Sequence, residues 1–397
     1  MTELLHIDDD DHYSRLRLIG WWRQERLAAA KILVVGAGAL GNEVLKNLAL
    51  VGVGQIYLID FDHIERSNLT RSVLFRRRDC GRSKAEVAAE AVEDINPDTR
   101  VTPWLANVIT DVGLGVFRDV DLVIGCLDNR EARLWVNRQC WKVGTPWIDG
   151  GIQEINGVIK TYLPGQGACY ECSMTENDYR LINLRYSCPL LPREDILAGK
   201  VPTAPTIASM IGAWQVQEAL KILHELPVEG GMAHVYNGAS NQVYTTRFQA
   251  KEDCLSHETF DDIQSLALQA REHTANDLFA AVRERFPAEA SLELVLDRDL
   301  VTSLVCACGQ SKPIHRARAA VKLSEAACPA CQQTMMPQMQ HTITPGSELA
   351  SQPLYQLGVP AYDIVRVTDG SQELYFALDG DRDAVMTKPT VPLATDG

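Results

Sequence analysis

A glycine-rich turn between two regular segments constrains the fold of this chain more than any other feature. Residues 31–36 (KILVVG) form an apolar run typical of a buried parallel strand, and residues 39–51 follow with a helical pattern. Gly36, Gly38 and Gly41 stand at this junction in the spacing G-x-G-x-x-G. The first glycine permits a tight turn, the second lets the backbone approach a phosphate, and the third lets the helix pack on the strand. Because a helix N-terminus also presents unpaired N–H groups, the turn predicts a nucleotide-binding site.

Strand-like and helix-like segments alternate after this turn. The strand-like segments are residues 55–62, 119–127, 145–149 and 157–163, and the helix-like segments are residues 83–96, 130–143 and 205–226. This alternation predicts an α/β fold with a doubly wound, mostly parallel sheet. From about residue 259 the pattern changes to short mixed pieces with further cysteines. We therefore expect a large domain at residues 1–258, a smaller α+β domain at residues 260–390 and a loose tail at residues 391–397.

The composition narrows the classes of partner. The 397 residues contain 38 Lys and Arg against 52 Asp and Glu, a net charge of -14, and nucleic-acid binders need a positive surface. No apolar run reaches the roughly 18 residues of a membrane span, and the acidic start MTELLHIDDDD is unlike a secretion signal. We expect a cytoplasmic protein that binds neither nucleic acid nor a membrane.

Charged residues follow the strands of the predicted sheet. In an open α/β sheet, ligands bind outside the carboxyl ends of the strands, so Gly36, Asp60 and Asp128 are expected to converge on one crevice. Arg71 and Lys84 would then face a triphosphate, and Asp128 would hold Mg²⁺, which takes one or two carboxylates together with phosphate oxygens. A nicotinamide dehydrogenase would share the glycine turn, but these charged residues favour a triphosphate.

Six motifs in this order resemble those of the ubiquitin-activating enzyme superfamily, which includes the adenylyltransferases for sulfur carriers in molybdopterin and thiamine synthesis. They are GAGALG (36–41), DFDHIERSNLTR (60–71), GRSKAEVA (81–88), GCLDNREAR (125–133), WIDGG (147–151) and CYEC (169–172). The resemblance covers about residues 12–258 and implies that residues 1–258 form a Rossmann-like adenylation domain. It is closest to a minimal, homodimeric activating enzyme of bacterial type, because only a short crossover segment, residues 173–205, precedes the long helix.

The resemblance also implies roles for single residues. In this superfamily the glycine turn shapes the phosphate loop, acidic and amide side chains bind the nucleotide, basic side chains hold its phosphates, and an arginine reaches the ATP of the opposite subunit. The corresponding residues here are Gly36, Gly38 and Gly41 for the loop, Asp60, Asp62 and Asn68 for the nucleotide, Arg71 and Lys84 for the phosphates, Asp128 for Mg²⁺, and Arg15 for the opposite subunit.

The implied chemistry suits these residue types. A C-terminal glycine carboxylate would attack the α-phosphorus of ATP, and positive groups would offset the repulsion between the two anions. The leading hypothesis is that a ubiquitin-like protein ending in glycine is adenylated and then passed through a thioester to a conjugating enzyme. The alternative is a sulfur-carrier adenylyltransferase without a conjugation step. A third possibility, a catalytically inactive scaffold, is disfavoured by the intact Arg71, Lys84 and Asp128.

Cys188 is the candidate for the thioester-forming thiol. It lies in the sequence RYSCPLLPR, between a cysteine pair and the long helix, where activating enzymes carry their acyl-accepting cysteine. Such a thiol must ionise, because the thiolate is the nucleophile. A sulfur-carrier adenylyltransferase can carry a cysteine here without needing it for adenylation, so both functions stay open.

Eight further residues predict two structural zinc sites. Closely spaced cysteine pairs in a chain from a reducing compartment indicate metal binding rather than disulfides, and four such ligands close a tetrahedral site. The first set is Cys169, Cys172, Cys254 and His257, and the second is Cys306, Cys308, Cys328 and Cys331. The superfamily usually has a cysteine where His257 stands, but an imidazole is also an acceptable zinc ligand. The smaller domain is expected to dock a conjugating enzyme or the carried protein.

Overall fold

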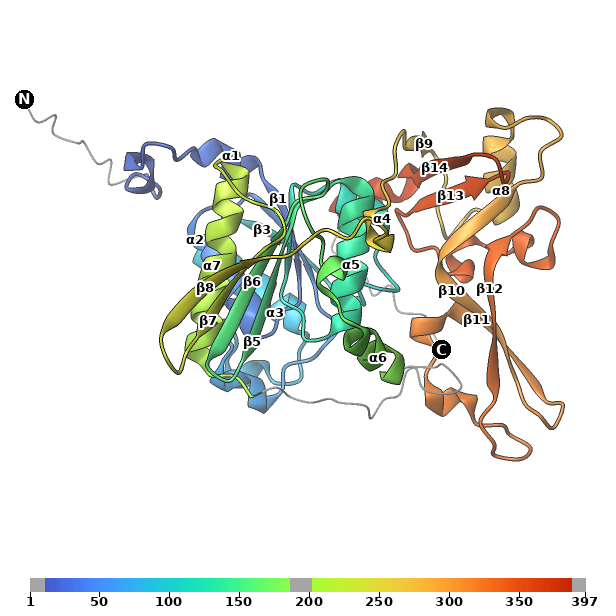
Figure 1. Cartoon of the computed structure of the whole chain (residues 1–397), viewed down its shortest axis with the longest axis horizontal. Coiled ribbons are helices and arrows are strands. Elements are labelled where there is room, and N and C mark those ends of the chain that lie inside the picture. Colours follow the sequence, from blue (N-terminus) through green and yellow to red (C-terminus); the bar gives the residue numbers. More distant parts are fainter. Residues whose placement is uncertain (1–10, 186–201, 388–397) are drawn as a thin grey trace, which may run out of the picture.

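The computed structural model describes residues 11–185 and 202–387, which form two β-sheets side by side (Figure 1). The helices are α1 (Gln24–Ala29), α2 (Ala39–Leu50), α3 (Lys84–Ile95), α4 (Leu114–Arg118), α5 (Arg130–Val143), α6 (Glu176–Arg185), α7 (Pro205–Leu223), α8 (Ala275–Val282) and α9 (Arg382–Thr387). The strands are β1 (Lys31–Val35), β2 (Gln55–Ile59), β3 (Arg100–Trp104), β4 (Leu122–Gly125), β5 (Trp147–Gln153), β6 (Asn156–Tyr162), β7 (Met232–Asn237), β8 (Gln242–Arg247), β9 (Gln264–Leu266), β10 (Glu293–Val305), β11 (Ser311–Ala317), β12 (Met336–Ile343), β13 (Ile364–Thr368) and β14 (Glu373–Leu378).

The larger sheet has eight strands in the order β3-β2-β1-β4-β5-β6-β7-β8. The first five in this order run parallel, and β6, β7 and β8 continue the sheet antiparallel. The strand order reverses between β1 and β4, and this reversal is the place where open α/β sheets bind ligands. The predicted doubly wound, mostly parallel α/β sheet is confirmed.

Alternation along β1 explains why helices cover both faces of this sheet. Ile32 and Val34 pack against one helical layer, formed by α2, α3 and α7. Leu33 and Val35 point the other way, into a second core with α4 and α5. Because each face is buried under a helical layer, residues 32–35 of β1 form a continuous apolar run.

The smaller sheet has the order β11-β10-β13-β14-β9, and β12 also pairs with β10. Its core packs beneath α8 and includes Leu278, Leu294 and Phe376. A separate small cluster around Val301, Leu304 and Met335 lies along the β10–β11–β12 hairpins, next to the second cysteine set. The expected second α+β domain with a cysteine cluster is therefore present.

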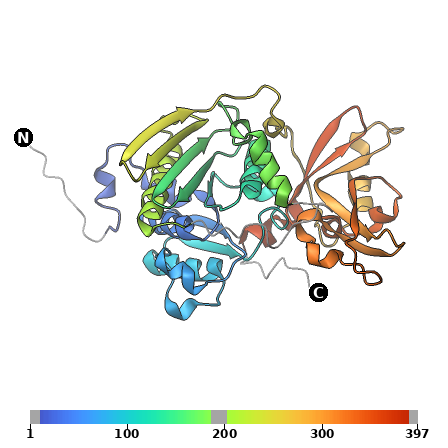
Figure 2. The ribbon, with the colours of Figure 1, turned by 60° about the horizontal axis from the view of Figure 1, so that its bottom comes forward.

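The smaller sheet lies beside α5, on the side of α5 away from the large sheet (Figures 1 and 2). The core around α5 includes side chains from both parts of the chain, among them Phe117, Tyr362 and Ile364. This shared core runs across the expected boundary, so the division at residues 258–260 stays a prediction.

Several elements of the large sheet region were not expected from the sequence, and β3 and α4 show why. The strand β3 (Arg100–Trp104) contains a proline and few apolar residues, and it lies at the sheet edge, where a missing N–H is tolerated. The helix α4 (Leu114–Arg118) has only five residues, too few for a helical pattern. Among the described residues, no helix has the length and apolar character needed to span a membrane.

Candidate nucleotide-binding site

The glycine turn joins β1 to α2 in a conformation that depends on its glycines. Gly36 has φ +102°, and a Cβ there would lie 2.5 Å from the carbonyl oxygen of Cys126. A Cβ at Gly41 would lie 2.0 Å from the carbonyl oxygen of Gly36. At Gly38, in contrast, a Cβ would meet no atom within 4 Å. The first and third glycines are therefore required by the protein's own packing, whereas the second faces open space that a ligand can enter.

Asp60 holds the glycine turn from the end of β2. One carboxylate oxygen accepts a hydrogen bond from the N–H of Ala37 at 2.7 Å, and the other accepts one from the N–H of Asp62 at 2.8 Å. Burial raises the pKa of Asp60, while nearby Lys84 and the two N–H groups act in the opposite direction. Each oxygen keeps a free lone pair, so Asp60 is also able to accept a hydrogen bond from a ligand hydroxyl.

Lys84 begins α3 next to this carboxylate. Its ammonium group forms a 2.6 Å ion pair with Asp62, and the Lys84 side chain is only 12% exposed. The N–H of Lys84 also donates to the carbonyl of Asp62, which ties the start of α3 to the end of β2. The site therefore holds a nearly buried cation at a helix N-terminus, where both the charge and the helix dipole favour an anion.

A pocket opens at the carboxyl ends of β1, β2, β3 and β4 and encloses about 920 Å³ including its mouth. Of the predicted residues, it brings together Gly36, Gly38, Asp60, Asp62, Lys84 and Asp128. Its walls also include the apolar residues Val35, Ile59, Ala106, Val108, Ile109, Leu127 and Ala132. A pocket lined by both charged and apolar side chains fits a ligand that has an anionic and an aromatic part.

Asp128 lies at the start of α5 with its side chain at the pocket. Its neighbour Asn129 caps α5 by accepting a hydrogen bond from the N–H of Ala132, and also donates to Asp128. Behind them, Arg133 forms a 2.8 Å ion pair with buried Asp149 and donates to the carbonyl of Leu127. This buried pair fixes the turn that carries Asp128, and it was not anticipated from the sequence.

Other predicted residues lie outside the pocket lining. Asn68 accepts a hydrogen bond from the N–H of Glu65, and Arg71 donates to the carbonyl of Ser67. Arg15 is exposed near the start of the described chain. Gly41 lies in α2 directly behind the turn. Cys188 falls outside the described residues, in the gap between α6 and α7.

The first cysteine cluster joins two segments far apart in the sequence. The sulfur of Cys169 lies 3.7 Å from that of Cys172 and 3.5 Å from that of Cys254, and the sulfur of Cys172 lies 3.3 Å from Nε2 of His257. Zinc–sulfur bonds of about 2.3 Å in a tetrahedron place two sulfurs about 3.8 Å apart. The four residues, His257 included, therefore offer a closed tetrahedral set for zinc.

The second cluster lies at the base of the β10–β11 turn. Cys306 and Cys331 approach to 3.5 Å between sulfurs, and Cys308 and Cys328 to 3.6 Å. All four sulfurs lie within 4.8 Å of one another. The unusual one-residue spacing of Cys306 and Cys308 is therefore compatible with a second four-sulfur zinc set.

Comparison with known proteins places this site in a family. The ThiF family model matches residues 11–256. Adenylyltransferase and sulfurtransferase MOCS3 of Drosophila virilis is 31% identical over 252 residues, covering 62% of this chain and 53% of the relative. SUMO-activating enzyme subunit 2 of Dictyostelium discoideum is 39% identical over 164 residues, covering 41% of this chain and 25% of the relative. The chain thus spans about half, or less, of the length of these relatives.

Solved structures agree with this assignment. A crystal structure of E. coli MccB with ATP aligns with a TM-score of 0.53 and 25% identity, covering 64% of this chain and 75% of that one. MccB with succinimide aligns with a TM-score of 0.52 and 26% identity, covering 63% and 74%. The matched region exceeds half of the chain, so the protein belongs to the ThiF family, within the superfamily of E1-like and sulfur-carrier adenylyltransferases.

Proposed function

We propose that this chain uses ATP to adenylate the C-terminal glycine of a ubiquitin-like protein. The observation that carries the proposal is the convergence of Gly38, Asp60, Lys84 and Asp128 on one pocket. Open space at Gly38 and the N-terminus of α2 suit the phosphates, and Asp60 suits the ribose hydroxyls. The apolar residues of the lining suit the base.

The proposed reaction needs positioning and charge rather than a general base. The glycine carboxylate, ionised at neutral pH, attacks the α-phosphorus, the bond to the bridging oxygen breaks, and pyrophosphate leaves. Lys84 exchanges Asp62 for a phosphate oxygen and offsets the charge that develops. The carboxylate of Asp128 fits Mg²⁺, which would neutralise phosphate charge when bound.

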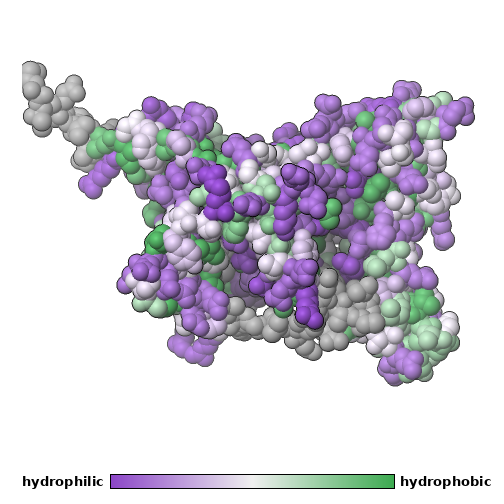
Figure 3. All heavy atoms as spheres, in the orientation of Figure 1, coloured by the Kyte–Doolittle hydropathy of each residue, from purple (hydrophilic) through white to green (hydrophobic). Residues whose placement is uncertain are grey.

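A second copy of the chain is proposed to complete the site. Arg15 lies on a segment that exposes Leu18, Ile19 and Trp21, each 37–42% accessible. Hydrophobic residues gather on this segment at the left of Figure 3. Burying them in a homodimer would bring Arg15 to the partner's pocket, as the superfamily resemblance implies. Light scattering of the full chain tests this, and a monomer would contradict it.

The next step is proposed to be thioester formation at Cys188. The thiolate attacks the carbonyl carbon of the acyl adenylate, AMP leaves, and the acyl group then passes to a conjugating enzyme. Zinc is proposed to bind both cysteine clusters, where closed four-ligand sets serve structure and leave no position for a substrate.

The test combines two assays with a ubiquitin-like protein that ends in glycine. Exchange of labelled pyrophosphate into ATP reports adenylation, and a protein adduct lost on reduction reports the thioester. Cys188→Ala is expected to abolish the adduct and retain exchange. An adduct that persists in this variant contradicts the assignment of Cys188, and no exchange with any glycine-ended carrier contradicts adenylation.

Sulfur-carrier activation is the second candidate. The relative with sulfurtransferase in its name matches 62% of this chain, against 41% for the SUMO-activating subunit, although the latter match has the higher identity. Under this alternative, the adenylate passes to a sulfur donor, and the carrier gains a thiocarboxylate. Mass spectrometry of the carrier after the reaction distinguishes the two products.

A further inference from the structure

The wall of the pocket that follows β3 lies next to the smaller domain. Ala106, Asn107, Val108 and Ile109, in the loop between β3 and α4, line the pocket on this side. Among the described residues of the smaller domain, Ala319 lines the same pocket. The wall that faces a bound base therefore includes residues from both domains.

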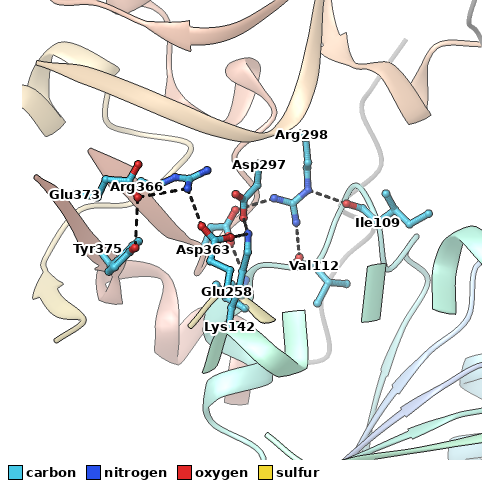
Figure 4. Close-up of polar contacts among 11 residues, drawn as sticks. Ile109, Val112, Lys142, Glu258, Asp297, Arg298, Asp363, Arg366, Glu373 and Tyr375 are labelled. Carbon is cyan, nitrogen blue, oxygen red and sulfur yellow. Dashed lines mark hydrogen bonds and ion pairs between the residues drawn. The ribbon is translucent and has the colours of Figure 1, made fainter. Parts of the chain in front are cut away.

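Arg298 connects the two domains at this wall (Figure 4). Its guanidinium group donates to the carbonyl of Ile109 at 2.7 Å, to the carbonyl of Val112 at 2.8 Å and to the carboxylate of Asp363 at 2.8 Å. The group also lies over the ring of Trp135 in α5, 4.6 Å from its centre. The Arg298 side chain is only 5% exposed, so all of these contacts are made away from water.

A bulge in β10 directs Arg298 to the loop. Val295 pairs with Thr342 and Leu300 with Gln340, so four residues of β10, numbers 296–299, face the single residue His341 of β12. Bulges of this kind redirect side chains out of the sheet pattern. Here the bulge carries Asp297, which pairs with Lys142 of α5 at 2.6 Å, and Arg298.

Asp363 holds the far end of the same loop. Its second carboxylate oxygen accepts a hydrogen bond from the N–H of Leu114, the first residue of α4, at 2.7 Å. The carbonyl of Tyr362 accepts one from Gly115 at 3.0 Å. A Cβ at Gly113 would lie 2.4 Å from that carbonyl oxygen, so the loop packs directly on the backbone of the smaller domain.

We propose that the smaller domain is part of the nucleotide-binding site, with Arg298 positioning the loop of residues 106–112 and Ala319 contacting the base. This inference rests on the proposed function, since it assumes that the pocket holds ATP. It assigns the smaller domain a role in base recognition, separate from the proposed phosphate contacts of Gly38 and Lys84.

The first test introduces a bulky side chain at Ala319, on the pocket wall that the smaller domain contributes. Ala319→Trp is expected to raise the Kd for ATP at least about tenfold, because the added ring occupies the space of the base. Its Kd for inorganic tripolyphosphate is expected to be unchanged. The matched control is Ala320→Trp, since Ala320 is exposed and does not line the pocket. Equal ATP affinity in Ala319→Trp and the wild type overturns the inference.

The second test separates Arg298 from the rest of the interface. Arg298→Met and Lys142→Met each remove an ion pair between the domains, but only Arg298 contacts the loop. Both variants are expected to lower Tm, and only Arg298→Met is expected to weaken ATP binding without weakening tripolyphosphate binding. Arg298→Lys is expected to recover part of the ATP affinity. Equal ATP affinities in Arg298→Met and Lys142→Met, or parallel losses for both ligands, overturn the positioning role.

The two proposals fail differently. A wild-type protein that binds neither ATP nor tripolyphosphate contradicts the proposed function itself. A wild-type protein that binds ATP, with variants at Ala319 and Arg298 that bind it equally well, contradicts only the role of the smaller domain.

Discussion

The two ends of the pocket are held in place in different ways. At the phosphate end, residues close together in the sequence contact one another: Asp60 accepts a hydrogen bond from the N–H of Ala37 in the glycine turn, and Lys84 forms an ion pair with Asp62. The base end is built from a loop whose carbonyls are held by Arg298, which lies far away in the sequence. Local motifs therefore determine the chemistry of the site, whereas a contact between domains determines the shape of its other end.

The largest expected effect concerns the phosphate end. Lys84→Ala should lower pyrophosphate exchange by about 10²–10³-fold, because it removes a nearly buried cation that faces the developing charge. Arg82→Ala is the control. Arg82 is only two residues from Lys84 in the sequence, but it pairs with the exposed Glu90 on the surface. Comparable exchange rates for the two variants would mean that Lys84 does not act on the phosphates.

Within the phosphate end, substitutions at Gly41 and at Gly38 are expected to have different effects. Gly41→Ala should destabilise the fold by about 1–3 kcal/mol, because its Cβ would lie 2.0 Å from the carbonyl oxygen of Gly36. This clash outweighs the gain of up to about 1 kcal/mol that alanine brings to a helix. Gly38→Ala should leave stability unchanged and weaken ATP binding. Thermal unfolding and ATP titration together separate the two effects, and a Gly38→Ala protein with normal affinity would show that no ligand approaches this residue.

The same contrast explains what the sequence could predict. The sequence alone predicts the Gly36 turn, Asp60 and Lys84, because the strand, the turn and the helix follow one another along the chain. Each of these positions also carries a residue type that its role needs: glycine in the turn, a carboxylate after β2 and a cation at the start of α3. The loop of residues 106–112 has no such pattern, since its shape depends on Arg298 and Asp363 in another domain. The helix α4 is too short to show periodicity, and β3 contains a proline, so both could be recognised only from the structure.

The second cysteine cluster links zinc binding to the base end of the pocket. The second cluster lies next to a core of few residues, so zinc there would supply much of the local stability, and structural zinc contributes about 10 kcal/mol or more. Cys306→Ser should therefore disorder the hairpins that carry Ala319 and raise the Kd for ATP severalfold, with little change for tripolyphosphate. Metal content and both affinities measure this. Unchanged ATP affinity after loss of zinc from this cluster would show that the cluster does not support the base end of the pocket.

The smallest expected effect serves as a reference for both ends. Arg247 and Glu229 form an ion pair on the surface in which both side chains are more than 60% exposed. Arg247→Ala should change the free energy of unfolding by less than about 1 kcal/mol, because solvent screens exposed pairs. ATP and tripolyphosphate affinities should equal those of the wild type. A clear loss of either affinity would indicate that the site extends to β8.

A crystal structure of the full chain with ATP and Mg²⁺ tests the central claim most directly. The account predicts the phosphates at the N–H groups around Gly38, close to Lys84 and Asp128, and the adenine between Val108 and Ala319. An ATP molecule bound elsewhere, or a pocket that takes a nicotinamide dinucleotide in preference to ATP, would contradict it.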